Sequence, residues 1–124
     1  MASEERAPVV RRVVIPAPRQ QVWRALTSVE LLSAWLGEVV ELEARAGGHV
    51  VVREPDGSTR RGLVESVDPA RSLVLRWRRL AGGGRGLEVG EATRVVFALE
   101  DDGAGTRVTV TEEPATMVAV GRGS

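Results

Sequence analysis

The chain opens with a run of β-branched residues and then changes to helical spacing. Residues 9–15 are typical of a strand, which Pro16 ends. Pro18 suits the first position of a helix, because it has no N–H group to lose there and its φ is preset. Val22 and Leu26 then share one face of that helix, while polar residues take the other.

A second short helix follows directly. Ser28 can cap its N-terminus, and Glu30 lies near the positive end of the helix dipole. Gly37 is suited to ending it. The residues between are strongly apolar, which predicts a helix that packs on a core: Leu31, Leu32, Trp35 and Leu36.

After Gly37 the apolar residues alternate with polar ones, which predicts strands. Short turns rich in Gly, Pro and Asp separate them. Residues 81–92 are rich in glycine and predict a loop, but they lack the lysine and the following helix of a phosphate-binding loop. The expected strands are 40–45, 49–54, 61–67, 73–78, 94–99 and 106–111.

Strands joined by such short turns must be antiparallel, because a parallel crossover needs about a dozen residues or more. The apolar face of such a sheet must also be covered, and the two short helices are the elements available to cover it. The sequence therefore predicts an α+β domain in which a strongly curved antiparallel sheet wraps around its cover.

A series of short segments carries a characteristic order and spacing: Ile15–Pro18, Gln21–Thr27, Leu32–Gly37, Ala46–Gly48, Gly62–Val64, Val67–Pro69, Leu73–Trp77 and Gly105–Val110. This series resembles the Aha-type family, named for the activator of heat-shock protein 90 ATPase. That family belongs to the START-like, SRPBCC superfamily. The resemblance covers about residues 9–113.

This resemblance implies the helix-grip fold of the birch-pollen allergen, in which a curved sheet grips a long C-terminal helix over a hydrophobic cavity. Residues 115–124 could form at most two or three helical turns, so we expect that helix to be shortened or missing. The expected organisation is a flexible N-terminus at 1–8, one START-like domain at 9–113, and a C-terminal tail or short helix at 114–124.

A shortened helix would leave the concave apolar face uncovered. A ligand, the tail or a second copy of the chain could then cover it, so a homodimer through this face is predicted. The residues expected on the face are Leu73, Leu75, Trp77, Val95, Phe97, Val108 and Val110.

Composition narrows the classes of partner. Basic and acidic residues are equal at 17 each, so no net charge attracts nucleic acid or an anionic membrane. No apolar run approaches the length of about 20 residues that a membrane span needs. The polar N-terminus lacks the apolar region of a secretory signal, and we expect a cytoplasmic protein without a cofactor.

Six apolar residues are the candidate ligand-binding set. For each of them, packing in the core is the competing interpretation, since most buried aromatic residues are structural. The Trp77 indole N–H could donate to a ligand oxygen or to a backbone carbonyl. The six are Leu32, Trp35, Leu36, Leu75, Trp77 and Phe97.

Ionisable candidates for catalysis are few. His49 is the only histidine, and alternation with Val50 places it on the convex, solvent-facing side of the sheet. Glu41 and Glu43 are expected to point outward as well. With one histidine and no cysteine, no metal set is expected, and the catalytic residues stay unknown.

The sequence thus favours a module that binds a small apolar ligand or partner on the concave face. Two alternatives stay open. The same fold serves cyclases and hydrolases, which would need an acid or base inside the cavity. It also serves co-chaperone domains, as the family's name suggests.

Overall fold

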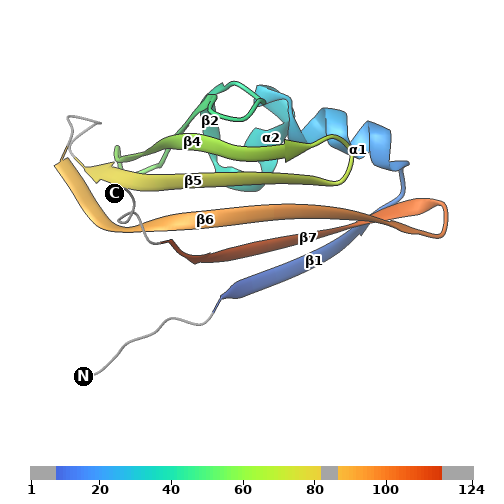
Figure 1. Ribbon diagram of the computed structural model, residues 1–124. Coiled ribbons are helices and arrows are strands. Elements are labelled where there is room, and N and C mark those ends of the chain that lie inside the picture. The colour runs from blue at the N-terminus through green and yellow to red at the C-terminus, as the bar shows by residue number, and fades with distance from the viewer. Residues whose placement is uncertain (1–7, 82–86, 116–124) are drawn as a thin grey trace.

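One curved antiparallel sheet forms most of the protein (Figure 1). The computed structural model describes residues 8–81 and 87–115, with the backbone alone for residues 81 and 87–91. The strands follow the order β1-β7-β6-β5-β4-β3-β2. Their bounds are β1 Val9–Ile15, β2 Glu38–Leu42, β3 His49–Arg53, β4 Thr59–Asp68, β5 Ser72–Ala81, β6 Leu87–Asp102 and β7 Gly105–Pro114.

All neighbouring strands pair antiparallel, as the short turns required. One boundary differs clearly from the sequence prediction. The loop expected at 81–92 is shorter, because β6 begins at Leu87 and pairs with the end of β5. Residues 82–86, where the phosphate-loop question arose, lie outside the described residues, as do residues 116–124 of the tail.

Two helices of eight residues each separate β1 from β2: α1 Arg19–Leu26 and α2 Val29–Leu36. The Ser28 side chain accepts a hydrogen bond from the Leu31 N–H at 3.3 Å, which confirms the predicted cap. Gly37 ends α2 with a φ of 108°, where a side chain would be strained. In the described part of the chain, no helix is long and apolar enough to cross a membrane.

Both helices pack on the concave face of the sheet around Phe97, whose side chain is fully buried. They bring Val22 and Leu26 from α1, and Leu32 and Leu36 from α2, into the same core as the sheet. The seven sheet residues expected on an uncovered face are at most 3% exposed. The prediction that this face lies open is therefore wrong at those positions.

A β-bulge in β2 changes which residues of that strand face the core. The register shifts between Val39 and Glu41, so Val39 pairs opposite Val52 and is buried. Val40, which strict alternation placed in the core, is 45% exposed instead. A pattern of period two does not reveal a bulge, and the prediction for Val40 is wrong for that reason.

Gly62 in β4 lies between Val50 and Trp77 of the adjoining strands. A Cβ atom at this position would come within 1.9 Å of the Arg76 carbonyl oxygen and 2.6 Å of the Trp77 Cα atom. Both are backbone atoms, which a rotamer change cannot move. Only glycine therefore lets β4 and β5 approach this closely here.

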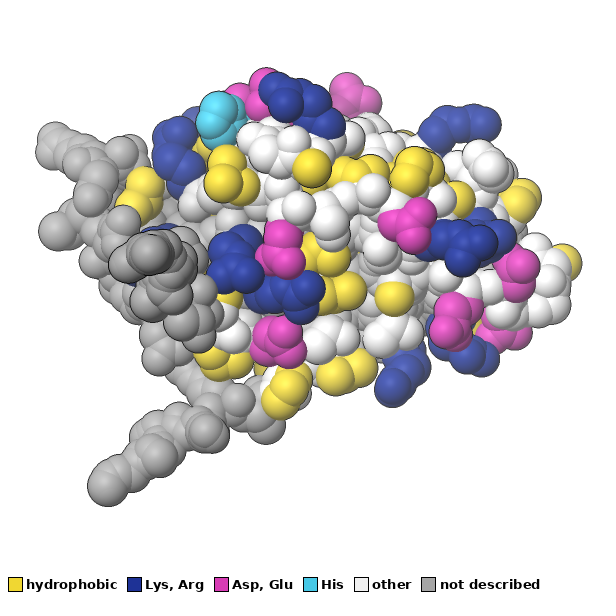
Figure 2. Space-filling view, in the orientation of Figure 1, with side chains coloured by type: hydrophobic (Ala, Val, Ile, Leu, Met, Phe, Trp, Pro, Cys, Tyr) yellow, Lys and Arg dark blue, Asp and Glu magenta, His cyan; other side chains and the backbone are white. Residues whose placement is uncertain are grey.

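The convex face carries a ladder of ion pairs across four strands, β4 to β7. Arg76 and Arg94 lie directly opposite each other, an arrangement that would repel if it were unrelieved. Glu65 is the extra residue of a bulge in β4, and its carboxylate accepts hydrogen bonds from both guanidinium groups. Arg94 also donates to Glu113 at 3.2 Å. Figure 2 shows acidic and basic side chains alternating in the middle of this face.

Edge strand β1 exposes apolar side chains on both of its faces. Val9, Val10, Val13 and Val14 are between 43% and 55% exposed. The other side of β1 pairs with β7, so one edge of its backbone has no strand partner within the described residues. Such an edge can pair with another chain, although the central arginines of the strand oppose aggregation.

The ladder predicts a pH dependence of stability. Hydrogen bonds from Arg94, and then from Arg76, lower the pKa of Glu65 below its ordinary value of 4.5. A carboxylate with a lowered folded-state pKa stabilises the fold above its unfolded-state pKa, and this contribution disappears as pH falls through the folded-state value. Glu65→Gln should therefore lower the free energy of unfolding by about 0.5–1 kcal/mol at neutral pH, the range of partly exposed ion pairs.

Urea unfolding of both proteins between neutral and acid pH measures this difference, with Ser66→Ala as the uncharged control on the same bulge. The difference between wild type and Glu65→Gln should shrink as pH falls below 4.5. A difference that is constant with pH, or that grows in acid, would contradict the assignment.

Candidate functional site

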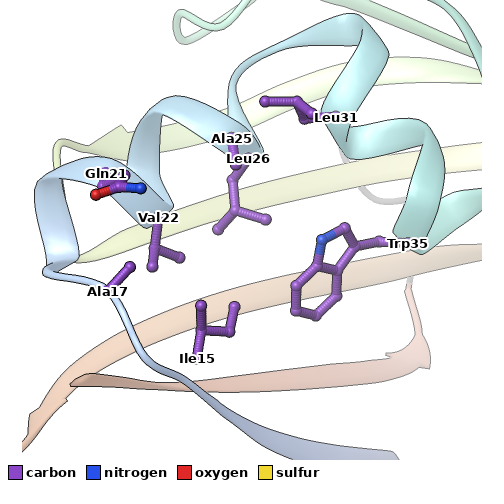
Figure 3. A pocket seen from close by; sticks show the side chains of 8 residues that line it. All are labelled: Ile15, Ala17, Gln21, Val22, Ala25, Leu26, Leu31 and Trp35. Atoms are coloured by element: carbon purple, nitrogen blue, oxygen red, sulfur yellow. The ribbon is translucent and has the colours of Figure 1, made fainter.

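A pocket of about 190 Å³ lies between α1, α2 and the end of β1. Figure 3 shows its side chains converging from these elements, with the indole of Trp35 extending from α2 toward Ile15 and Leu26. The pocket is lined by Ile15, Ala17, Gln21, Val22, Ala25, Leu26, Leu31 and Trp35.

The spacing of the helical residues explains the shape of this pocket. Gln21 and Ala25 are four residues apart in α1, as are Leu31 and Trp35 in α2, so each pair lies on one side of its helix. Ala25 carries only a methyl group where a longer side chain would fill the space. The pocket therefore exists because a small residue of α1 faces the long side chains of α2.

Trp35 forms one wall and is itself held by the core. Its ring lies edge-on to Phe97, with the ring centroids 6.2 Å apart and an angle of 79° between the planes. This is a favoured arrangement for two aromatic rings. Within the described residues the Trp35 indole N–H donates no hydrogen bond, so it could serve an acceptor on a ligand.

The corner between β1 and α1 is held by residues that are distant in the sequence but lie at the same end of the sheet. Thr106, which is fully buried, donates a hydrogen bond from its hydroxyl to the Ala17 carbonyl at 2.7 Å. Arg19 donates to the Asp101 carboxylate and to the Ala70 carbonyl, each at 2.8 Å. These hydrogen bonds hold Ala17, which lines the pocket, and the start of α1 against the turns that join β4 to β5 and β6 to β7.

The side chains that line the pocket are almost all apolar. Gln21 supplies the one polar side chain among the eight lining residues, and it is exposed. Leu31 is also 54% exposed, whereas Leu26 is fully buried, so the pocket opens to solvent past Gln21 and Leu31. None of the eight side chains is ionisable, so a ligand would be held by burial of apolar surface together with the single hydrogen-bond donor of Trp35.

The six residues proposed from the sequence as a ligand-binding set lie close to this pocket or in the core behind it. Trp35 lines the pocket, and Phe97 supports it from the sheet. Leu32, Leu36 and Leu75 are buried in the core.

Trp77 is 3% exposed, and the guanidinium of Arg60 lies 5.1 Å from the centre of its ring. Arg60 also forms an ion pair with Glu54. This is a cation–π contact, and the Arg60 side chain covers one face of the Trp77 indole. Trp77 does not contribute to the lining of the pocket.

Of the eight lining residues, sequence reasoning selected Trp35 alone. It assigned Val22 and Leu26 to one face of the helix without a binding role. It did not select Ile15, Ala17, Gln21, Ala25 or Leu31. The available signal was Ala25, a small residue within the amphipathic pattern of α1. Whether a small residue at this position leaves a pocket depends on the distance between α1 and α2, which the sequence pattern does not give.

His49, Glu41 and Glu43 lie on the opposite side of the sheet from the pocket, as expected. The His49 side chain is 62% exposed, and it pairs opposite Leu63 on the convex face. Glu41 is also exposed, with 47% of its side chain accessible. These residues are therefore far from the apolar lining of the pocket.

Comparison with known proteins identifies relatives of the whole domain. The model of the family described as "Activator of Hsp90 ATPase homolog 1-like protein" matches residues 16–123. No curated protein sequence matches significantly.

Several solved structures share the fold. DynU16, a putative protein in the dynemicin biosynthetic locus, is 26% identical with a TM-score of 0.70; the match covers 90% of this chain but only 39% of DynU16. MLL2253 from Mesorhizobium loti is 23% identical over 90% of this chain and 79% of its own, with a TM-score of 0.72. The Aha1 dimer from Colwellia psychrerythraea is 21% identical over 92% and 81%, with a TM-score of 0.64.

The buried hydroxyl at the pocket corner can be tested by Thr106→Val, which keeps the shape and removes the donor. The Ala17 carbonyl would lose its partner, so the free energy of unfolding should fall by about 1–3 kcal/mol. Thr109→Val, on the same strand but the opposite face, should change it by less than about 0.5 kcal/mol. Equal effects of the two substitutions in denaturant unfolding would show that this hydrogen bond does not fasten the corner.

Proposed function

This chain belongs to the Activator of Hsp90 ATPase homolog 1-like family, and we propose that it is a module that binds a small apolar ligand in the pocket between α1, α2 and β1. The observation that carries the proposal is a cavity of about 190 Å³ with seven apolar side chains among its eight lining residues. Burial of apolar surface there would drive binding, at roughly 25 cal/mol per Å².

The size of the pocket limits the ligand. An engineered apolar cavity of about 150 Å³ binds benzene, and drug-sized molecules need about 300 Å³ or more. A pocket of about 190 Å³ therefore fits a single substituted ring or a short branched chain. The Trp35 N–H has no hydrogen-bond partner among the described residues, which favours a ligand that carries one hydrogen-bond acceptor, such as an aromatic ketone.

The comparisons support a role with small organic molecules. DynU16 belongs to a biosynthetic locus, and at 26% identity it is related to this chain in sequence as well as in fold. DynU16 is much longer than the matched region, so its own activity is not carried over. The proposal uses only one fact about DynU16, namely that a protein of this fold is encoded in a locus for the biosynthesis of a small organic compound.

The two alternatives lack comparable support. A cyclase or hydrolase needs an acid or base at the ligand, and none of the eight lining side chains provides one. A co-chaperone role rests on the family's name alone. Both stay predictions from the resemblance.

Filling the pocket tests the proposal directly. Acetophenone at about ten times its Kd should raise the Tm of the wild-type chain by about 3–6 °C. Ala25→Leu places an isobutyl group in the pocket and should abolish this shift. Ala34→Leu makes the same change at an exposed position of α2 and should keep it. The proposal fails if acetophenone, ethylbenzene and similar single-ring compounds never shift the wild type, or if they shift Ala25→Leu equally.

Pairing of two copies also stays a prediction, now placed at a different surface. The Aha1 structure from Colwellia psychrerythraea is a dimer, and the exposed valines of β1 offer an apolar edge for a second copy. Light scattering at high micromolar concentration should give twice the chain mass of 13.3 kDa. Val10→Lys should return the monomer, and a wild type that is monomeric at that concentration would contradict the prediction.

A further inference from the structure

The hairpin of β2 and β3 gathers three side chains with metal-binding atoms. His49 begins β3, Glu41 lies in β2, and Glu43 follows the end of β2. The His49 Nδ1 atom lies 3.3 Å from Glu43 Oε1 and 3.9 Å from Glu41 Oε2. One ligand atom from each residue lies within 4.8 Å of the other two.

These distances suit a shared cation. Two ligands that are each about 2.1 Å from a tetrahedral zinc ion lie about 3.4 Å apart. The separation between His49 Nδ1 and Glu43 Oε1 already matches that value, and Glu41 needs only a small rotation of an exposed side chain. One imidazole nitrogen and two carboxylates form a mixed donor set that suits Zn²⁺ and its neighbours in the first transition row.

The pairing of β2 with β3 brings these groups to one face. Glu41 lies opposite Val51 and Leu42 opposite Val50, so Leu42 faces the core and Glu41 faces the convex side, which also carries His49. The bulge at Val40 lies just before this regular stretch. It lets Val39 face the core opposite Val52 while Glu41 keeps the convex side.

Glu43 is held in position for coordination. The His49 backbone N–H donates to Glu43 Oε1 at 2.9 Å, and the Glu43 N–H donates to the His49 carbonyl at 2.9 Å. A ligating carboxylate is commonly oriented by such a hydrogen bond. Arg45, 3.8 Å from the same oxygen and 70% exposed, is the cation that a metal would displace.

We propose that Glu41, Glu43 and His49 form a binding site for a divalent transition-metal cation such as Zn²⁺. The remaining coordination positions are open to water, because all three side chains are between 40% and 62% exposed. The site lies on the convex face and is independent of the ligand pocket. It escaped sequence reasoning because a single histidine with acids spread over nine residues matches no standard ligand spacing.

The single histidine makes the test direct, since every imidazole NMR signal of the untagged chain comes from His49. Titration with ZnCl₂ should shift these signals saturably, with the larger ¹⁵N change at Nδ1. Glu41→Gln and Glu43→Gln should each weaken binding by at least about tenfold, a loss that even an outer-shell partner of a metal ligand can cause.

Glu38→Gln is the matched control, an exposed acid on the same strand that pairs with Arg53 outside the cluster. It should bind Zn²⁺ like the wild type, and His49→Ala should abolish binding in calorimetry. Two outcomes overturn the proposal. One is a His49 signal that Zn²⁺ leaves unchanged. The other is equal affinity of the wild type and both glutamine variants, which would mean that His49 binds the ion alone.

Discussion

Burial of the concave face of the sheet is the constraint on which the rest of the structure depends. That face is centred on Phe97, and two helices of only eight residues each pack against it. Isolated helices shorter than about 12 residues are marginal in water, so α1 and α2 owe their stability to this packing. The edge-on contact of Trp35 with Phe97 joins helix and sheet. Where α1 offers only Ala25 between longer side chains, the cover is incomplete, and the pocket is the space that remains.

The two faces of the sheet are thus divided between different interactions. The concave side is apolar and holds the pocket at one corner, fastened by Thr106 and Arg19. The convex side carries the ladder centred on Glu65 and, at the hairpin of β2 and β3, the cluster around His49. A ligand in the pocket and a cation on the hairpin would therefore act on separate surfaces.

Much of the fold could be predicted from the sequence, because it follows from local rules. Alternation identified the strands, and Ser28 and Gly37 marked the ends of α2. Errors arose where hydrogen bonding between strands or packing between distant segments decides the outcome. The bulge at Val40 breaks the alternation, and the pocket beside Ala25 depends on the separation of α1 and α2. Trp35 could be chosen from the sequence because a large aromatic side chain commonly forms the wall of a pocket. Small or polar lining residues such as Ala17, Ala25 and Gln21 carry no such signal.

The most direct test of the central claim is NMR of methyl-labelled protein under xenon pressure, since xenon enters apolar cavities of this kind. If the pocket is present, saturable shifts are expected only at the methyl groups around it, foremost those of Ile15, Leu26 and Leu31. Valine methyls on the convex face serve as the internal reference. Shifts that are absent, or that grow linearly and equally at all exposed methyl groups, would show that the two helices close over the sheet without leaving a binding space.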